Sequence, residues 1–193
     1  MENNSVKSAI LKSIVLLALG AVVIVGLYFM FVGTKKDPGE EQYNLTAVDE
    51  ITTTNLEKNY PANPRKVVDL YANIMKVLYK EEYTDGQQDK MLEVLQGIMD
   101  DELLAGQSDF KKSIKNEVAE RKKGDYSISN YIVQNSEPEV LNVSGKKMCN
   151  VGCTFRLLKK GSGGFPNYYQ FILRQDEEGR WKILGWQVKQ NDN

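Results

Sequence analysis

The stretch MCNVGCTF, residues 148–155, decides how the second half of this chain folds. Apolar and polar side chains alternate along it, which is the period of a β-strand with one buried face. The side chains on that face are Cys149, Val151, Cys153, Phe155 and Leu157. Four residues of strand separate the two cysteine Cα atoms by about 13 Å, too far for a disulfide. We therefore predict that both cysteines are small, buried hydrophobic residues.

The same alternation recurs in four other segments of the second half, and turn residues rich in Gly and Pro separate them. The predicted strands are residues 126–133, 139–143, 147–158, 168–174 and 180–188. Short links between consecutive strands predict antiparallel hairpins. In the last strand the alternation places Trp181, Ile183 and Gly185 on one face, and Leu184, Trp186 and Val188 on the other.

The preceding part of the chain has apolar residues at three- and four-residue spacing, which is the period of an amphipathic helix. We predict three helices, at residues 64–82, 87–104 and 109–123. Asn63 offers an N-cap oxygen to the first helix, and Pro64 suits the first helical position because its missing N–H is not needed there. Ser108 is the predicted N-cap of the third helix. Gly106 and Gly124 are the predicted stops of the second and third helices.

An uncharged segment near the start of the chain, IVLLALGAVVIVGLYFMFV at residues 14–32, is long enough to cross a bilayer. As a helix it would extend about 28 Å. No small-residue cleavage site follows it, so we predict a retained anchor and not a signal peptide. Equal numbers of basic residues flank the segment, and the free N-terminus adds the positive charge that favours an N-in orientation.

These features predict four parts in the chain. They are a short cytoplasmic tail at residues 1–13, a transmembrane helix at 14–32, a polar linker at 33–63 and a folded domain at 64–190. The linker has few large apolar residues and contains Pro38-Gly39, which is typical of an extended tether. The predicted location is the cell membrane, with the domain outside the cytoplasm.

Three helices followed by four to five antiparallel strands predict an α+β fold, with the helices packed on one face of a curved sheet. This order, with the closing segment GRWKILGW at residues 179–186, resembles the nuclear transport factor 2-like (cystatin-like roll) superfamily. The segments YPANPR at 60–65 and DDELL at 100–104, with the closing strand, resemble an uncharacterised family of single-span proteins from anaerobic Gram-positive bacteria. The resemblance implies a roll behind a transmembrane helix and a bacterial surface setting. It implies no activity, because one fold hosts many functions.

The chain contains no histidine, and this narrows the chemistry that we expect of it. The absence of histidine excludes Ser–His and Cys–His pairs as catalytic nucleophiles, and two cysteines supply too few ligands for a zinc site. Asp69 and Lys76 lie opposite the apolar face of the first helix, so we expect both to be solvated. Glu81 and Glu102 are nearer an apolar face but lie at predicted helix ends. The sequence therefore predicts no catalytic residue, no metal site and no cofactor.

Two functions of different classes are compatible with this organisation. The first is a membrane-anchored, extracytoplasmic binding or assembly module without catalytic activity, which engages a protein partner at the cell surface or a second copy of itself. A net charge of −1 gives nucleic-acid binding little electrostatic driving force, so no nucleic-acid partner is predicted. The second is a small-ligand carrier or a pocket enzyme of the isomerase or dehydratase type, acting on an apolar molecule inside the roll. The predicted pocket lining is Tyr71, Phe155, Tyr169, Phe171 and Trp186.

Overall fold

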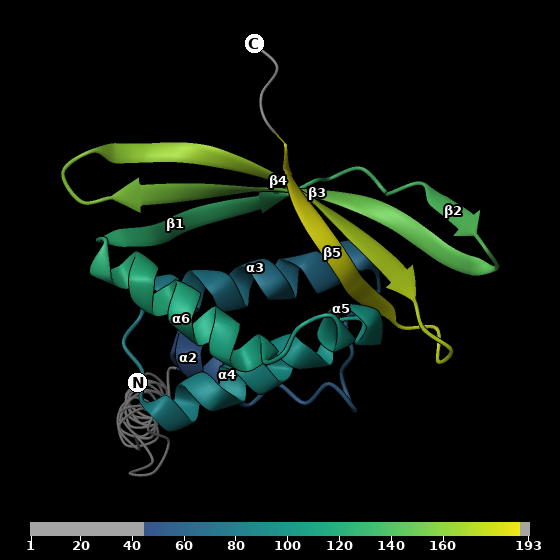
Figure 1. Ribbon diagram of the computed structural model, residues 1–193, viewed down its shortest axis with the longest axis horizontal. Helices are drawn as coiled ribbons and strands as arrows, with labels where there is room; N and C mark the ends of the chain where they lie inside the picture. Colours follow the sequence, from purple (N-terminus) through teal and green to yellow (C-terminus); the bar gives the residue numbers. More distant parts are fainter. Residues whose placement is uncertain (1–44, 190–193) are drawn as a thin grey trace, which may run out of the picture. The chain divides into compact units, whose positions relative to one another are not determined.

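Helices form the first half of the described chain and strands form the second half, as the two periodicities predict. The computed structural model describes residues 45–189 (Figure 1). The helices are α2 (Ala47–Thr52), α3 (Pro64–Lys80), α4 (Asp85–Gly97), α5 (Asp101–Ala105) and α6 (Phe110–Lys123). The strands are β1 (Tyr126–Val133), β2 (Val140–Val143), β3 (Lys146–Lys159), β4 (Gly163–Gln175) and β5 (Trp181–Lys189). The helices pack on one face of a curved antiparallel sheet, which confirms the predicted α+β class.

The predicted tail, the predicted transmembrane helix at 14–32 and the first part of the predicted linker lie outside the described residues. Over residues 45–189, no helix has both the length and the apolar character that crossing a bilayer requires.

Residues 45–63 are packed structure, so the prediction of an extended tether over 33–63 is wrong for this part. Thr46 and Asp49 form a capping box at the start of α2: Thr46 Oγ1 accepts from Asp49 N at 3.1 Å, and Asp49 Oδ2 accepts from Thr46 N at 3.2 Å. Val48 and Ile51 are buried in the core. A six-residue helix with two buried residues is too short to give a periodic signal, which is why the sequence did not reveal it.

Helix α3 lies under the sheet and supplies much of the core. Its predicted start is confirmed, because Asn63 Oδ1 accepts from Lys66 N at 3.0 Å and Pro64 occupies the first helical position. The expectation that Asp69 and Lys76 are solvated is wrong in part. Both are partly buried, and the Asp69 carboxylate accepts a hydrogen bond of 3.1 Å from the hydroxyl of Tyr131 on β1. The sheet therefore covers more of α3 than its apolar stripe alone.

The single helix predicted at 87–104 is two helices, α4 and α5. Between them Met99 forms a parallel bridge with Ile183 of β5. Ile183 N donates to Ile98 O at 2.9 Å, and Asp100 N donates to Ile183 O at 2.9 Å. This short strand stops α4, while Gly106 caps α5 as predicted.

The start of α6 also differs by one residue from the prediction. Asp109 and not Ser108 is the N-cap, because Asp109 Oδ1 accepts from Lys112 N at 2.9 Å. The predicted stop at Gly124 is confirmed.

The sheet has the order β1-β3-β4-β5, and β2 also pairs with β3. Strands β1 and β2 lie along the same edge of the long strand β3, β1 opposite residues 153–159 and β2 opposite residues 146–149. Strand β4 begins at Gly163, five residues before its predicted start at 168. Gly161 and Gly163 have φ near +80°, which a hairpin turn of this kind requires.

A bulge in β5 changes which side chains face the core. Ile183 lies opposite Leu173 and Trp186 lies opposite Phe171, with a register shift between the two pairs at Leu184. One extra residue moves the following side chains to the other face of the sheet. Ile183 and Trp186 therefore share the core face, and the predicted alternation, which separated them, is wrong beyond Leu184.

Cys149 and Cys153 are buried, free thiols on the core face of β3, as predicted. Burial raises the pKa of the Cys149 thiol to about 11 and that of the Cys153 thiol to about 12. Since the thiolate is the reactive form, we expect no reaction of the native protein with a thiol reagent at pH 8. Both thiols should react once guanidinium unfolds the protein. A spectrophotometric thiol assay tests this, and rapid labelling of the native protein would contradict the burial.

Candidate functional site

Five aromatic side chains form a continuous cluster between α3 and the sheet, and they are the five that the sequence predicted to line a pocket. They are Tyr71 on α3, Phe155 on β3, Tyr169 and Phe171 on β4, and Trp186 on β5. The Tyr71 ring centroid lies 4.9 Å from that of Phe171 and 5.6 Å from that of Trp186. The rings of Phe155 and Tyr169 meet edge to face at 5.4 Å. The fold thus brings the five residues together.

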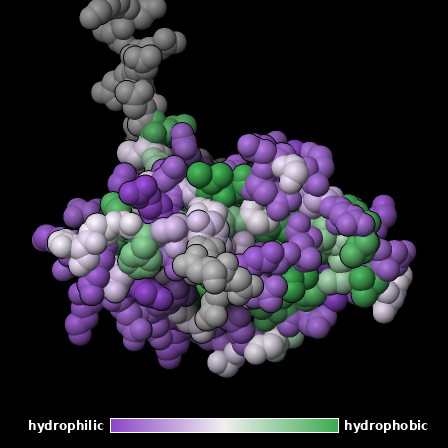
Figure 2. All heavy atoms as spheres, turned by 90° about the horizontal axis from the view of Figure 1, so that it is seen from above, coloured by the Kyte–Doolittle hydropathy of each residue, from purple (hydrophilic) through white to green (hydrophobic). Residues whose placement is uncertain are grey.

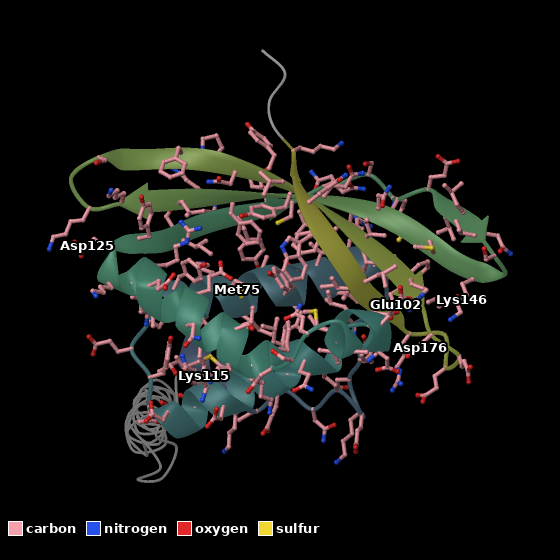
Figure 3. The ribbon with its side chains drawn as sticks, in the orientation of Figure 1. Met75, Glu102, Lys115, Asp125, Lys146 and Asp176 are labelled. Carbon is pink, nitrogen blue, oxygen red and sulfur yellow. The ribbon has the colours of Figure 1, made fainter. Side chains whose placement is uncertain are left out.

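A small pocket lies beside this cluster, between α6 and the core face of the sheet. Its volume is about 60 Å³. The lining residues are Tyr71, Met75, Tyr79, Glu117, Arg121, Ile128, Phe155, Leu157, Tyr169 and Trp186. Met75 lies between the helices and the sheet (Figure 3), and Phe171 is fully buried behind the other rings. Ligand sites usually have about 300–1,000 Å³, so this pocket has room for a terminal group and not for a whole ligand.

Glu117 supplies the polar side of the pocket, and the sequence did not single it out. Its Oε1 atom accepts a hydrogen bond of 2.8 Å from the hydroxyl of Tyr79. Burial raises the pKa of Tyr71, Tyr79 and Tyr169, and the Glu117 carboxylate raises it further. These three hydroxyls therefore stay protonated at neutral pH and remain hydrogen-bond donors.

Two exposed apolar side chains lie on the core face of the sheet, each opposite a residue of the pocket lining. Phe165 lies opposite Leu157, and Val188 lies opposite Tyr169, so all four share this face. The exposed fractions of Phe165 and Val188 are 44% and 57%. We call Phe165, Val188, Tyr169, Trp186 and Glu117 the pocket mouth. It joins an exposed apolar rim to one carboxylate.

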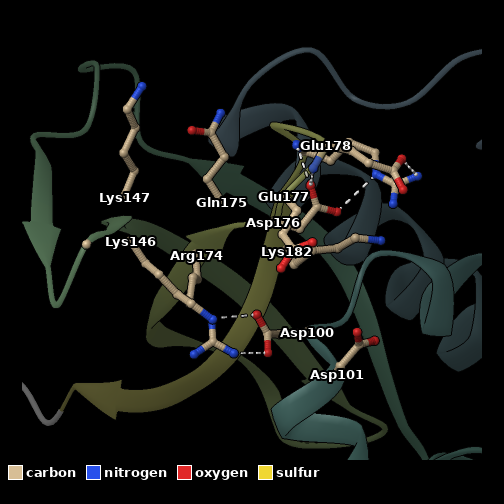
Figure 4. A pocket seen from close by; sticks show the side chains of 12 residues that line it. Asp100, Asp101, Lys146, Lys147, Arg174, Gln175, Asp176, Glu177, Glu178 and Lys182 are labelled. Carbon is tan, nitrogen blue, oxygen red and sulfur yellow. Dashed lines mark hydrogen bonds and ion pairs between the residues drawn. The ribbon is translucent and has the colours of Figure 1, made fainter.

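A larger, open cleft lies at the end of the sheet that carries the β2–β3 and β4–β5 turns (Figure 4). Its volume is about 690 Å³. Its charged lining residues are Asp100, Asp101, Asp176, Glu177 and Glu178 against Lys146, Lys147, Arg174, Arg180 and Lys182. Arg174 binds Asp100 through two nitrogens and Glu102 at 2.8 Å, and Arg180 binds Asp176 at 3.0 Å. The charges compensate each other, so we interpret this cleft as a structural feature with little attraction for ions.

The outer face of the sheet mixes hydrophobic and hydrophilic residues. Figure 2, a view from above, shows hydrophobic residues in several separate groups. Ile132 and Leu141 are exposed apolar residues, with exposed fractions of 64% and 53%. Ile132 lies opposite Thr154 and Leu141 lies opposite Met148, both on this outer face. These two residues serve below as controls for the pocket mouth.

Comparisons with known proteins place the chain in a family. The family model of a domain of unknown function, DUF6715, matches residues 1–186. The chain belongs to this family. The predicted membership of an uncharacterised family is thus confirmed, and no curated protein matches this DUF6715 chain.

Among solved structures, the crystal structure of the intermembrane space region of chloroplast protein ARC6 is similar to the DUF6715 chain. The identity is 13% and the TM-score is 0.33, and the match covers 64% of this chain and 92% of that one. This likeness is too distant to inform the function.

Proposed function

We propose that this DUF6715 protein is a membrane-anchored, extracytoplasmic binding or assembly module that engages a protein partner through its pocket mouth. The observation that carries the proposal is the filled interior of the roll. A volume of about 60 Å³ leaves no room to enclose a substrate, whereas Phe165 and Val188 at the rim are exposed. Binding therefore uses the surface of the roll and not a chamber inside it.

The anchor and the nuclear transport factor 2-like roll are parts of the same proposal. The apolar segment at 14–32 supports the single span, and helices followed by a curved antiparallel sheet support the roll. The family match runs over both the segment and the domain, which supports their acting as one unit. The alternative, a carrier or enzyme for an apolar molecule, has weaker support because it needs a larger enclosed cavity.

The proposed location has a direct test in intact cells that produce the full-length chain. Added protease should remove the domain while a cytoplasmic marker protein survives. Survival of the domain until the membrane is permeabilised would contradict the extracytoplasmic orientation.

The proposed partner has a second test, which is chemical cross-linking in membranes followed by purification of the full-length chain. We expect a partner protein to co-purify with the unsubstituted chain. A variant with Phe165→Ser and Val188→Ser should lose most of that partner, because both apolar rim contacts are removed. The matched control, Ile132→Ser with Leu141→Ser on the outer face, should retain it. Equal loss in both variants, or recovery of the chain alone, would contradict a partner at the pocket mouth.

A further inference from the structure

The pocket combines aromatic walls with one carboxylate, and this is the chemistry that recognises an organic cation. Its aromatic walls are Tyr71, Tyr79, Phe155, Tyr169 and Trp186, and Glu117 stands on α6 at the opening. Aromatic faces attract a cation within about 6 Å of the ring centroid, and a carboxylate adds a charge-assisted hydrogen bond. We propose that the pocket binds an aliphatic ammonium group. The inference rests on the proposed function, because it names the chemical group that a partner inserts.

The size of the pocket fits this kind of group. About 60 Å³ admits the end of a chain and excludes a complete ring system. A lysine side chain is a compact ammonium on a flexible aliphatic stem. Its stem would lie along Val188, an exposed apolar residue opposite Tyr169 of the lining.

The pocket lining also contains one positive group, Arg121. At the Tyr169 hydroxyl, Glu117 has a larger influence on the pKa than Arg121, and the two act in opposite directions. The guanidinium carbon of Arg121 lies 5.6 Å from the ring centroid of Tyr126, over that ring. Tyr79 occupies one oxygen of Glu117, and within residues 45–189 no ion pair engages this carboxylate. Glu117 thus has acceptor capacity left for a ligand.

A fluorescence titration of the full-length protein in a maltoside detergent tests the inference. Trp181→Phe leaves Trp186, beside the pocket, as the remaining tryptophan. The cationic probes are n-butylammonium and choline, and the neutral probes of matched shape are 1-butanol and 3,3-dimethyl-1-butanol. We expect a saturable change in Trp186 emission with a cationic probe and none with its neutral counterpart at the same concentration. Equal responses to cationic and neutral probes would overturn the inference.

Two glutamate variants test whether the negative charge of Glu117 contributes to cation binding. Glu117→Gln keeps an acceptor for the Tyr79 hydroxyl but removes the negative charge, and we expect about fivefold weaker binding of the cation. Glu120→Gln lies on the same helix outside the pocket lining and should bind as the unsubstituted chain does. Thermal unfolding followed by circular dichroism confirms that both variants are folded. Unchanged binding by Glu117→Gln would also overturn the inference.

The two cationic probes identify the source of the ammonium group. Tighter binding of n-butylammonium assigns the site to a lysine of the partner, and tighter binding of choline assigns it to a quaternary ammonium; both outcomes support the inference. If a partner cross-links but neither cation binds, the ammonium-binding inference is contradicted and the proposed function stands. If a cation binds but no partner cross-links, the proposed function is contradicted and ammonium binding by the pocket stands.

Discussion

Replacing Phe171 by alanine is expected to lower the free energy of unfolding by about 3–5 kcal/mol. Phe171 is fully buried, and its ring contacts those of Tyr71, Tyr169 and Trp186. Truncation removes the centre of this aromatic cluster and leaves a cavity that the strands on either side cannot close. Urea denaturation followed by circular dichroism measures the loss.

The control for this prediction lies on the same strand. Phe165→Ala removes an equally large ring from an exposed position, and we expect a change within about 0.5 kcal/mol. Phe171→Leu should lie between the two variants, because it retains most of the buried volume. Equal losses at positions 165 and 171 would show that the interior of the domain is not filled as described.

Asp100→Asn is expected to lower the free energy of unfolding by about 2–3 kcal/mol. Asp100 is 6% exposed and binds the Arg174 guanidinium through both carboxylate oxygens. The substitution leaves the guanidinium, whose side chain is 17% exposed, without its buried partner. The loss falls below the 3–5 kcal/mol typical of a broken buried pair, because Glu102 still binds Arg174. Asparagine can still cap α5, so the measurement isolates the effect of the charge.

The neighbouring residue provides the matched control, since Asp101 is exposed and does not bind Arg174. Asp101→Asn should change stability by no more than about 0.5 kcal/mol. Adding Arg174→Met to Asp100→Asn should restore part of the loss, because no unpaired buried charge remains. Equal effects of Asp100→Asn and Asp101→Asn would contradict the role given to this ion pair.

Local sequence chemistry was enough to find most elements of the fold. The bounds predicted for β1 match the structure, although its alternation is interrupted by a register shift between Ile128 and Asn130. Asn63-Pro64 and Gly124 mark helix ends through hydrogen bonds that involve only their near neighbours. These features need no knowledge of the rest of the molecule.

Features that depend on contacts between residues far apart in the chain could not be predicted from the sequence. The break between α4 and α5 forms because residues 98–100 pair with Ile183 of β5, while the apolar spacing continues across it. The bulge at Leu184 reverses the faces of β5, and a regular alternation cannot reveal an inserted residue. Ser108 and Asp109 are both good N-caps, so local preference alone does not choose between them.

The aromatic residues of the candidate site could be predicted from the sequence, but its carboxylate was missed. The aromatic residues Tyr71, Phe155 and Trp186 were expected near each other because the fold class places α3 under β3 and β5. Glu117 was missed because only the apolar stripe of α6 was considered. It follows Ile114 by three residues and therefore borders that stripe, a signal that would have placed it near the sheet.

The measurement that tests the central claim most directly is site-specific photo-cross-linking in living cells that produce the full-length chain. A p-benzoylphenylalanine in place of Phe165 or Val188 reports on the pocket mouth, and one in place of Ile132 reports on the outer face of the sheet. We predict covalent adducts with one and the same protein from positions 165 and 188, and none from position 132. Adducts from position 132 alone, or equally from all three positions, would contradict binding at the pocket mouth.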